Sequence, residues 1–378
     1  MDLLSDDVRR DPYPVYDRLR AVAPVLPFGP AWVLLDHASV SRALREPEVF
    51  GSEVVPPTGK APDWLIFTDP PRHGRQRALI AKAFTPRSVA QLEPRIREVA
   101  RELIGGRTEL EIVGDLATPL PMLVIAAMLG IPAADRERFV RWADGINGLS
   151  YAAVGGPAAQ EMIAAYYDVR EEAEPYVAAL VEERRRDPRE DLITRLAHAE
   201  IDGERLTGAD LFGFFQLLLA AGTETTTNLI ANSILCAAEH GVPRDIPRFV
   251  EEVVRYRTPA QIMFRQTKQA VELHGVAIPR DAFVLVAVGA ANRDPAAFAE
   301  PNRFDPTRDP NPHVGFGHGI HYCVGAALAR LEARVVLEEL FALGAPVLAG
   351  DEPWTPRKAL HVLGPTALPV AFSRTRST

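Results

Sequence analysis

The stretch FGHGIHYCVG, residues 316–325, decides the fold of this chain. The 378-residue sequence contains only two cysteines, Cys236 and Cys323, and the second one lies in this glycine-rich stretch. Glycines permit positive φ and a close approach of the backbone, so the loop can hold one sulfur atom in the open. A strongly helical run, VGAALARLEARVVLEELF, follows Cys323 directly. Cys323 is therefore expected at a helix N-terminus, where a thiolate is stabilised.

Three interpretations of Cys323 compete on the residues alone. A cysteine is usually a small buried side chain, although the surrounding glycines argue against that. A Cys–His hydrolase would use Cys323 as the nucleophile and His318 or His321 as the base, but such partners are usually distant in sequence. In the third interpretation the sulfur is an axial ligand of haem iron.

Composition limits the other possibilities. The formal net charge of −8 gives no sign of nucleic-acid binding. The amino terminus lacks the apolar core of a signal peptide, and the apolar stretch 120–131 is shorter than the roughly 20 residues that span a bilayer. Two cysteines exclude a disulfide scaffold and a four-thiolate metal site. We expect a cytoplasmic protein that does not bind a membrane.

Apolar residues at spacings of three and four predict a mainly α protein with small β-sheets, a single domain over 1–378. The predicted helices are 14–22, 39–44, 71–83, 88–104, 121–129, 134–145, 158–186, 191–199, 208–239, 246–257 and 325–343. The predicted strands are 32–35, a hairpin of 271–273 and 276–278, 283–288 and 367–372. The proline-rich region 291–319 is expected to be irregular and functional.

The cysteine loop resembles the haem-binding signature of the cytochrome P-450 superfamily. The matching positions are Phe316, Gly319, His321, Cys323 and Gly325. The resemblance implies the single-domain fold of that family, with haem b between a long distal helix and the helix after Cys323. It also implies that Cys323 is the axial ligand, that His321 binds a propionate and that Phe316 packs beside the sulfur. Gly317 and Gly325 would give the porphyrin room.

The segment LLLAAGTETTTNLI, residues 217–230, interrupts an apolar helix with four threonines and one acid. Threonine is a poor helix former, and its hydroxyl can bond back to the carbonyl one turn earlier. The segment is similar to the distal-helix motif of the family, matched by Ala221, Gly222, Thr223, Glu224 and Thr225. By that resemblance Glu224 and Thr225 are catalytic and handle protons during O₂ activation, while Ala221 and Gly222 lie against the cofactor.

Two further constellations match the family in the same order along the chain. Glu252 and Arg255 in EEVVRY are three residues apart on a helix, and the resemblance adds Arg303 as the third member of a structural triad. The two propionates of haem need donors. The resemblance assigns them to His73 and Arg77 in DPPRHGRQR and to Arg265 in IMFRQT.

The resemblance also implies substrate and partners. The pocket residues placed by it are Leu65, Ile66, Leu218, Ile262, Met263 and Leu363. They indicate a mostly apolar organic substrate. Between residues 71 and 92 there are several bases and no acid, and we expect an acidic ferredoxin to dock near Arg72, Arg75, Lys82 and Arg87. NAD(P)H would act only indirectly, through a ferredoxin reductase.

The function expected from all of this is that of a monomeric haem-thiolate monooxygenase. It would insert one oxygen atom from O₂ into the substrate, by hydroxylation or by epoxidation, in the tailoring of a bacterial natural product. A non-catalytic haem-binding sensor is the main alternative, and a Cys–His hydrolase is a distant one.

Overall fold

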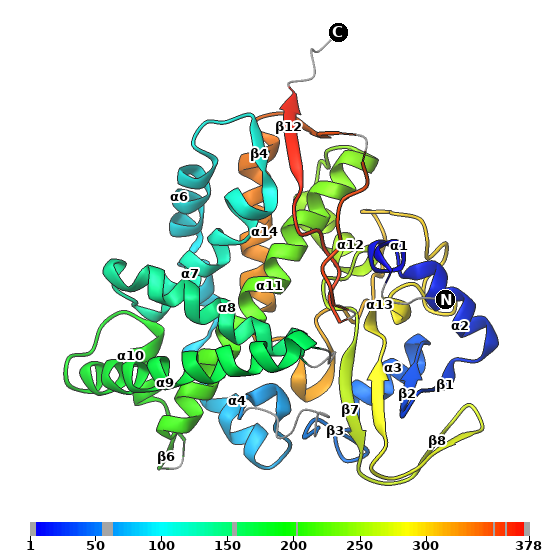
Figure 1. Ribbon diagram of the computed structural model, residues 1–378, viewed down its shortest axis with the longest axis horizontal. Coiled ribbons are helices and arrows are strands. Elements are labelled where there is room, and N and C mark those ends of the chain that lie inside the picture. Colours follow the sequence, from blue (N-terminus) through cyan, green and yellow to red (C-terminus); the bar gives the residue numbers. More distant parts are fainter. Residues whose placement is uncertain are drawn as a thin grey trace. The chain divides into compact units, whose positions relative to one another are not determined.

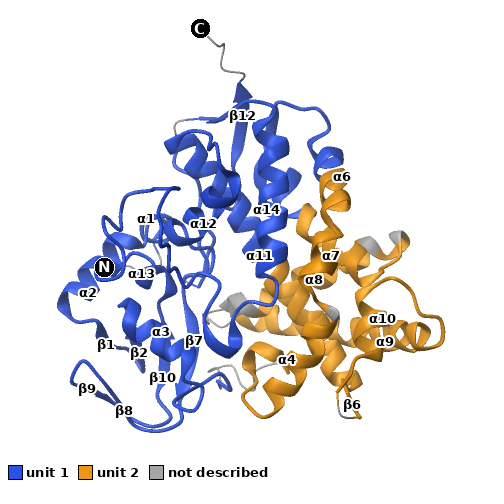
Figure 2. Cartoon of the chain, turned by 180° about the vertical axis from the view of Figure 1, so that it is seen from behind, with its two compact units in different colours: residues 1–54, 100–119, 225–378 blue, residues 55–99, 120–224 orange. Residues whose placement is uncertain are grey.

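The computed structural model describes residues 5–54, 63–152, 157–201, 203–350, 352–359 and 361–373. The chain forms two compact units from interleaved segments (Figure 2). Unit 1 contains residues 1–54, 100–119 and 225–378, and unit 2 contains residues 55–99 and 120–224. A single domain over 1–378 stays a prediction.

Unit 1 holds most of the strands, several of which are labelled in Figure 1, and it also holds the segment of the cysteine loop. Its helices are α1 (Asp6–Arg10), α2 (Tyr13–Val22), α3 (His37–Arg45), α12 (Ile246–Tyr256), α13 (Val288–Ala291) and α14 (Ala326–Phe341), with short helical turns at Ile112–Ala117 and Gly319–His321. Its strands are β1 (Val25–Phe28), β2 (Ala31–Leu34), β3 (Phe50–Gly51), β4 (Glu109–Glu111), β7 (Met263–Thr267), β8 (Val271–Leu273), β9 (Val276–Ile278), β10 (Phe283–Val286), β11 (Ala345–Leu348) and β12 (Pro369–Ser373).

The main sheet has the strand order β1-β2-β10-β7-β3. Strands β2 and β10 run parallel, and the other neighbours are antiparallel. Alternate residues of a strand face opposite sides, so the sheet carries two apolar faces. Leu34 belongs to a core with Val40 and Leu44 of α3, whereas Val33 belongs to a core against which Leu19 of α2 packs. A second sheet, in the order β11-β12-β4, joins the C-terminal strands to residues 109–111.

Unit 2 is mostly helical. It contains α4 (Arg72–Ala83), α5 (Pro86–Ala90), α8 (Arg136–Ala152), α9 (Pro157–Arg186) and α10 (Leu192–His198), short turns at Leu65–Phe67 and Ala133–Asp135, and the strand pair β5 (Glu200–Ile201) and β6 (Glu204–Arg205). Trp142 is fully buried between α8 and its neighbours, packed edge-on against Phe215 and Tyr176. Its indole N–H donates to Glu172 over 3.0 Å, which satisfies the one polar atom of the ring.

Three helices have residues in both units, namely α6 (Glu93–Ile104), α7 (Pro119–Leu129) and α11 (Gly208–His240). Helix α11 is continuous, and the boundary between the units falls between Glu224 and Thr225. Within the described residues, Ile112–Leu129 is the one apolar stretch that meets the length and composition of a membrane span. Of this window 67% is buried inside the protein, as in a core helix. The prediction of a mainly helical protein with small sheets is confirmed.

Candidate active site

Cys323 lies in a tight loop, three residues before α14 begins at Ala326. Its backbone N–H donates to the carbonyl of Phe316 over 2.9 Å, which closes the loop. Gly317 and Gly319 have φ angles of +74° and +69°, a conformation that other residues adopt at a cost. The Cys323 side chain is exposed, and its Sγ lies 4.0 Å from where a Cβ on Gly325 would be. The loop therefore presents the sulfur at the surface and keeps nearby side chains small.

The two cysteines differ in their environment. Cys236 is fully buried in α11, and this burial raises the pKa of its thiol to about 12. A thiol in that environment stays protonated at neutral pH and is a poor ligand and nucleophile. Cys323 is the exposed one. Chemistry at sulfur therefore belongs to Cys323.

The loop is packed against α3. A Cβ on Gly319 would lie 2.6 Å from the carbonyl oxygen of Leu44 and 3.1 Å from Cα of Arg45, so only glycine fits here. The ring of His321 lies 3.0 Å from Oγ of Ser52, measured from Nε2. Ser52 follows β3, which pairs with the β7 strand that carries Arg265. Two of the predicted propionate donors thus lie on adjoining elements of unit 1.

A fully buried ion pair holds the irregular segment before the loop. The Nε and Nη2 atoms of Arg255 donate to the two carboxylate oxygens of Glu252 over 2.8 and 2.7 Å. The remaining N–H groups of Arg255 donate to the backbone carbonyls of Asn292 and Pro301 over 3.0 and 2.8 Å. Glu252 also accepts from the backbone N–H of Asp305 over 2.8 Å. This pair, which we call the brace, fastens α12 to residues 292–305.

The third member of the triad, after Glu252 and Arg255, is Arg308, and the prediction of Arg303 is wrong. The Arg303 side chain is 63% exposed and pairs with Glu300 over 3.0 Å, while only its backbone carbonyl accepts from Arg255. A turn that joins the Arg303 N–H to the Glu300 carbonyl directs this side chain outward. The Arg308 side chain is 12% exposed, and its Nε lies 3.7 Å from Oε1 of Glu252.

A second ion pair lies beside the loop, and no motif in the sequence predicts it. Glu251 of α12 binds Arg330 of α14, and the Arg330 guanidinium lies 4.2 Å from the centre of the Phe316 ring. Glu251 also lies 3.0 Å from Nε2 of His313, and Arg330 donates to the hydroxyl of Tyr322 over 3.2 Å. The only signal in the sequence is the first acid in EEVVRY, Glu251, next to the glutamate that the motif uses.

In the threonine-rich segment of α11, burial differs from one residue to the next. Thr223 and Glu224 are buried, Gly222 and Thr225 are half-buried, and Ala221 is exposed. Ala221 therefore presents only a methyl group on the exposed side of the helix. A planar group beside this position stays a prediction.

Packing within unit 2 also explains part of the motif. A Cβ on Gly222 would lie 2.7 Å from Cδ1 of Ile125, so α7 itself requires a small residue there. The hydroxyl of Thr223 donates to the carbonyl of Leu219 over 2.7 Å and accepts from Asn147 over 3.2 Å. The expected bond to the preceding turn is therefore confirmed at Thr223. It shows that one threonine of the run has a structural role.

Comparison with known proteins decides the family. The family model "Cytochrome P450" matches residues 246–342, which include the brace and the cysteine loop. The erythromycin C-12 hydroxylase of Saccharopolyspora erythraea is 40% identical over 354 residues, which cover 90% of this chain and 88% of the hydroxylase. The cyclomarin C epoxidase of Salinispora arenicola is 38% identical over 366 residues, which cover 90% of each chain. This chain belongs to the cytochrome P450 family.

A solved structure agrees over the whole length. A cytochrome P450 from Chondromyces apiculatus matches with a TM-score of 0.89 and 37% identity, covering 100% of this chain and 99% of the other. This cytochrome P450 is accordingly a haem-dependent monooxygenase, an oxidoreductase that uses O₂ as co-substrate. Electrons reach such an enzyme from redox partners.

The donor set of this cytochrome P450 fits haem by its chemistry. Haem iron needs an axial ligand, which the exposed Cys323 thiol offers, and two propionates need cationic or N–H donors. Arg265 is buried on β7 and His321 is half-buried in unit 1. His73 is buried and Arg77 is half-buried on α4 of unit 2. The residue types that the group requires are thus present at the predicted positions.

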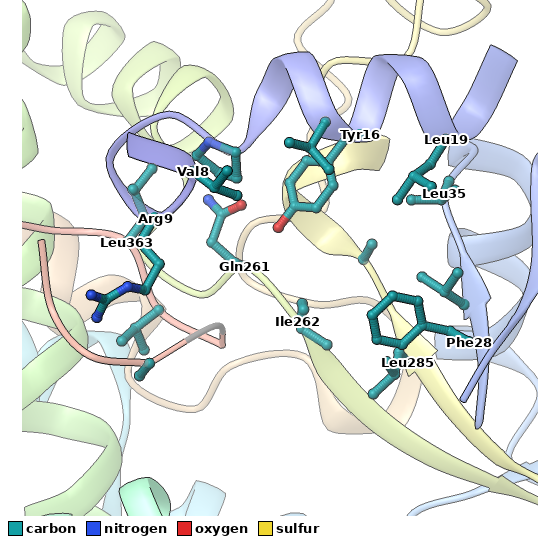
Figure 3. A pocket seen from close by; sticks show the side chains of 16 residues that line it. Val8, Arg9, Tyr16, Leu19, Phe28, Leu35, Gln261, Ile262, Leu285 and Leu363 are labelled. Atoms are coloured by element: carbon teal, nitrogen blue, oxygen red, sulfur yellow. The ribbon is translucent and has the colours of Figure 1, made fainter. Parts of the chain in front are cut away.

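The residues predicted for the substrate pocket lie in both units. Leu65, Ile66 and Leu218 belong to unit 2, and Ile262, Met263 and Leu363 belong to unit 1. Ile262 and Leu363 border an apolar pocket between α2 and the main sheet, close to Gln261 and Tyr16 (Figure 3). Its volume of about 80 Å³ is well below the roughly 300–1,000 Å³ of sites for larger organic ligands. This pocket is too small for the predicted substrate.

The basic patch on α4 is partly neutralised by acids that lie far away in the sequence. Arg72 donates to Asp210 over 3.1 Å, and Arg75 donates to Glu204 over 3.2 Å. The ammonium group of Lys82 donates to the carbonyl of Glu200 over 2.7 Å. The absence of acids within 71–92 therefore overstates the positive charge of this surface.

Proposed function

We propose that this cytochrome P450 inserts one oxygen atom of O₂ into a mostly apolar organic molecule and that the other atom leaves as water. Hydroxylation of an unactivated carbon is the main reaction, and epoxidation of a double bond is the second. The observation that carries the proposal is the exposed Cys323 in the glycine loop that follows the segment 292–305, which the buried Glu252–Arg255 brace fastens. When bound there, haem supplies the iron at which O₂ is activated.

The chain supplies the surroundings of this chemistry. We assign the axial thiolate to Cys323, with Phe316, Gly317 and Gly325 shaping the loop around it. His321 and Arg265 of unit 1 would bind one or both propionates, together with His73 and Arg77 of unit 2. On α11, Ala221 and Gly222 would lie along the porphyrin face.

Proton delivery is assigned to neighbouring residues of α11. The carboxyl group of Glu224 is buried, and the Thr225 side chain is half-buried at the next position. An acid and a hydroxyl so close together can hold and pass protons to the reacting oxygen. Glu224 and Thr225 follow Ala221 by three and four residues, so a cofactor along the Ala221 side of the helix would lie near both of them.

The residues predicted for the substrate pocket and the names of the relatives support the proposed substrate class. Leu65, Ile66, Leu218, Ile262, Met263 and Leu363 are all apolar, which favours an apolar molecule. The names of two relatives, an erythromycin hydroxylase and a cyclomarin epoxidase, support a role in tailoring a bacterial natural product. We propose that the protein acts as a cytoplasmic monomer.

We propose a small acidic ferredoxin as the electron donor, itself reduced by NAD(P)H through a ferredoxin reductase. The docking surface would lie near Arg72, Arg75, Lys82 and Arg87. The ion pairs of Arg72 and Arg75 leave less free positive charge than the sequence implies, so steering should be modest. The rate of reduction by ferredoxin is expected to fall as salt rises, and a salt-independent rate would contradict this docking mode.

The test of the function is the spectrum of the reduced protein with carbon monoxide. The purified protein is expected to be red and to show the strongly red-shifted Soret band of thiolate-ligated haem. Cys323→Ser should lose this band, whereas Cys236→Ser, at the buried cysteine, should keep it. A folded, colourless preparation that cannot be reconstituted with haem would refute the proposal. Product formation with a reconstituted electron donor separates the enzyme from a haem-binding sensor.

The role of Thr225 has a separate test. Thr225→Ala should keep the thiolate-type band and divert reducing equivalents from product to hydrogen peroxide. Thr227→Ala is the matched control, because the Thr227 hydroxyl donates to the carbonyl of Ala117 over 2.8 Å and has a structural role. Equal ratios of product to peroxide in both variants would remove Thr225 from the mechanism.

A further inference from the structure

We propose that Glu251 and Arg330 are positioning residues that hold the segments on both sides of Cys323. This proposal rests on the proposed role of Cys323 as the haem ligand. The pair, which we call the clamp, is distinct from the Glu252–Arg255 brace: the brace fastens residues 292–305, whereas the clamp acts on the loop itself.

The clamp joins α12 to α14. The Nε and Nη2 atoms of Arg330 donate to the two carboxylate oxygens of Glu251 over 2.5 and 2.9 Å. Such two-point contacts fix the direction of a guanidinium as well as its distance. Burial alone would raise the pKa of Glu251, but the hydrogen bonds from His313 and Arg330 outweigh it and hold the pKa at about 2. Glu251 is therefore ionised under all ordinary conditions.

Arg330 transmits this fixed geometry to both sides of the cysteine. Its guanidinium lies 4.2 Å from the centre of the Phe316 ring, in the range of a cation–π contact. The Phe316 carbonyl in turn accepts the backbone N–H of Cys323 over 2.9 Å. On the other side, Nη1 of Arg330 donates over 3.2 Å to the hydroxyl of Tyr322, the residue just before the cysteine.

The loop needs such an anchor because it has little regular structure of its own. Gly317 and Gly319 adopt positive φ angles, and the stretch from Tyr322 to Gly325 lies outside any helix or strand. A thiolate that serves as a ligand must keep one position while the chain around it fluctuates. Arg330 connects this irregular backbone to two helices, α12 and α14.

The test compares the clamp with a similar ion pair on the same helix. Arg334 and Glu338 pair over 2.8 Å within α14, one turn beyond Arg330, and Arg334→Lys is the matched control. Glu251→Gln removes the charge of the clamp with little change of shape, and Arg330→Lys keeps the charge but removes the planar fork. Phe316→Leu leaves the ion pair intact and removes only the ring.

The measurement is made on full-length, haem-loaded protein in mild urea. The reduced carbon monoxide complex is followed as its band changes from the thiolate type to the type without thiolate. We expect this conversion to be about tenfold faster in Glu251→Gln, Arg330→Lys and Phe316→Leu than in the control, with the haem reduction potential also shifted. The far-UV circular dichroism midpoint of Phe316→Leu should stay close to that of the control.

Two outcomes would overturn the clamp. One is conversion in all three variants at the rate of Arg334→Lys. The other is conversion that follows global unfolding in every variant, which would give Glu251 and Arg330 a general structural role only. A wild-type protein without the thiolate-type band refutes the proposed function instead, so the two failures are distinguishable.

Discussion

Replacing Glu332 by glutamine is expected to stabilise the protein at neutral pH. Glu332 lies in the middle of α14, where its residue is 1% exposed. Its Oε1 has no hydrogen-bond partner among the described residues. Burial without a compensating cation raises the pKa of this carboxyl to about 8. The Glu332 carboxyl is therefore protonated and neutral in the folded protein at neutral pH.

The magnitude follows from the difference between the folded and unfolded pKa values. In the unfolded chain the carboxyl ionises near its ordinary pKa of 4.5, while the folded protein keeps the proton until about pH 8. Each pH unit between these values lowers the free energy of unfolding by about 1.4 kcal/mol. At pH 7 the loss is about 3 kcal/mol, it reaches about 5 kcal/mol above pH 8, and it vanishes below pH 4.5. A glutamine at this position does not ionise, so it loses no unfolding free energy as the pH rises. Burial of its amide adds a pH-independent cost of about 1–3 kcal/mol.

The assay is urea unfolding of the wild type and of Glu332→Gln, followed by far-UV circular dichroism between about pH 5 and about pH 8. The difference in unfolding free energy is expected to rise by about 1.4 kcal/mol for each pH unit. Glu338→Gln is the control, because Glu338 lies on the same helix and pairs with Arg334 near the surface. A difference between wild type and Glu332→Gln that stays constant from about pH 5 to about pH 8 would refute the reasoning.

Two further pairs of variants test the site. Arg308→Gln should lower the free energy of unfolding by about 1–3 kcal/mol, because it removes a largely buried cation from the brace, whereas Arg303→Gln at the exposed position should change it by less than about 0.5 kcal/mol. Equal urea midpoints of Arg308→Gln and Arg303→Gln would contradict the assignment of Arg308 as the third member of the triad. Gly319→Ala should destabilise the loop and weaken haem retention more than Gly317→Ala does. Both positions have positive φ, which costs about 1–2 kcal/mol, but only the Cβ at 319 would collide with backbone, 2.6 Å from the carbonyl oxygen of Leu44. The order is checked by urea unfolding and by the rate of haem transfer to an apo-globin.

Helical periodicity could be read from the sequence because it is local. The predicted helices 158–186, 208–239 and 325–343 correspond to α9, α11 and α14 within a few residues at each end. The predicted helix 88–104 is two helices, α5 and α6, since the periodic pattern continues across the break. Periodicity of three and four residues does not show where a chain turns.

Two strands of the main sheet, β1 and β7, are not predicted by the sequence, for a different reason. Strand β7, MFRQT, carries a buried arginine and a buried threonine in place of an apolar alternation. Strand β1, VLPF, contains a proline, which counts against a strand. Both strands form because β10 and β2 pair with them, and that pairing is a property of the tertiary fold.

The contrast between local patterns and tertiary contacts also separates the site residues that the sequence predicts from those that it does not. The spacing around Cys323 and the pair Glu252–Arg255 are local, and the structure places both as expected. The choice between Arg303 and Arg308 depends on a turn at residue 300, which the motif spacing does not contain. The pairing of Glu251 with Arg330 joins residues 79 positions apart, so no local pattern contains it.

Adjacent acids on α12 explain how one short helix can organise the whole approach to the cysteine. Successive side chains of a helix point about 100° apart, so Glu251 and Glu252 face different neighbours. Glu252 faces the interior, and through Arg255 it holds the segment from residue 292 to residue 305. Glu251 faces α14, and through His313 and Arg330 it holds the segment that follows. Both stretches of irregular chain before the cysteine are thus held by side chains of the same helix, α12. The sulfur can therefore keep a fixed position in a glycine-rich loop. A substitution in α12 should accordingly alter the surroundings of the sulfur without contacting it.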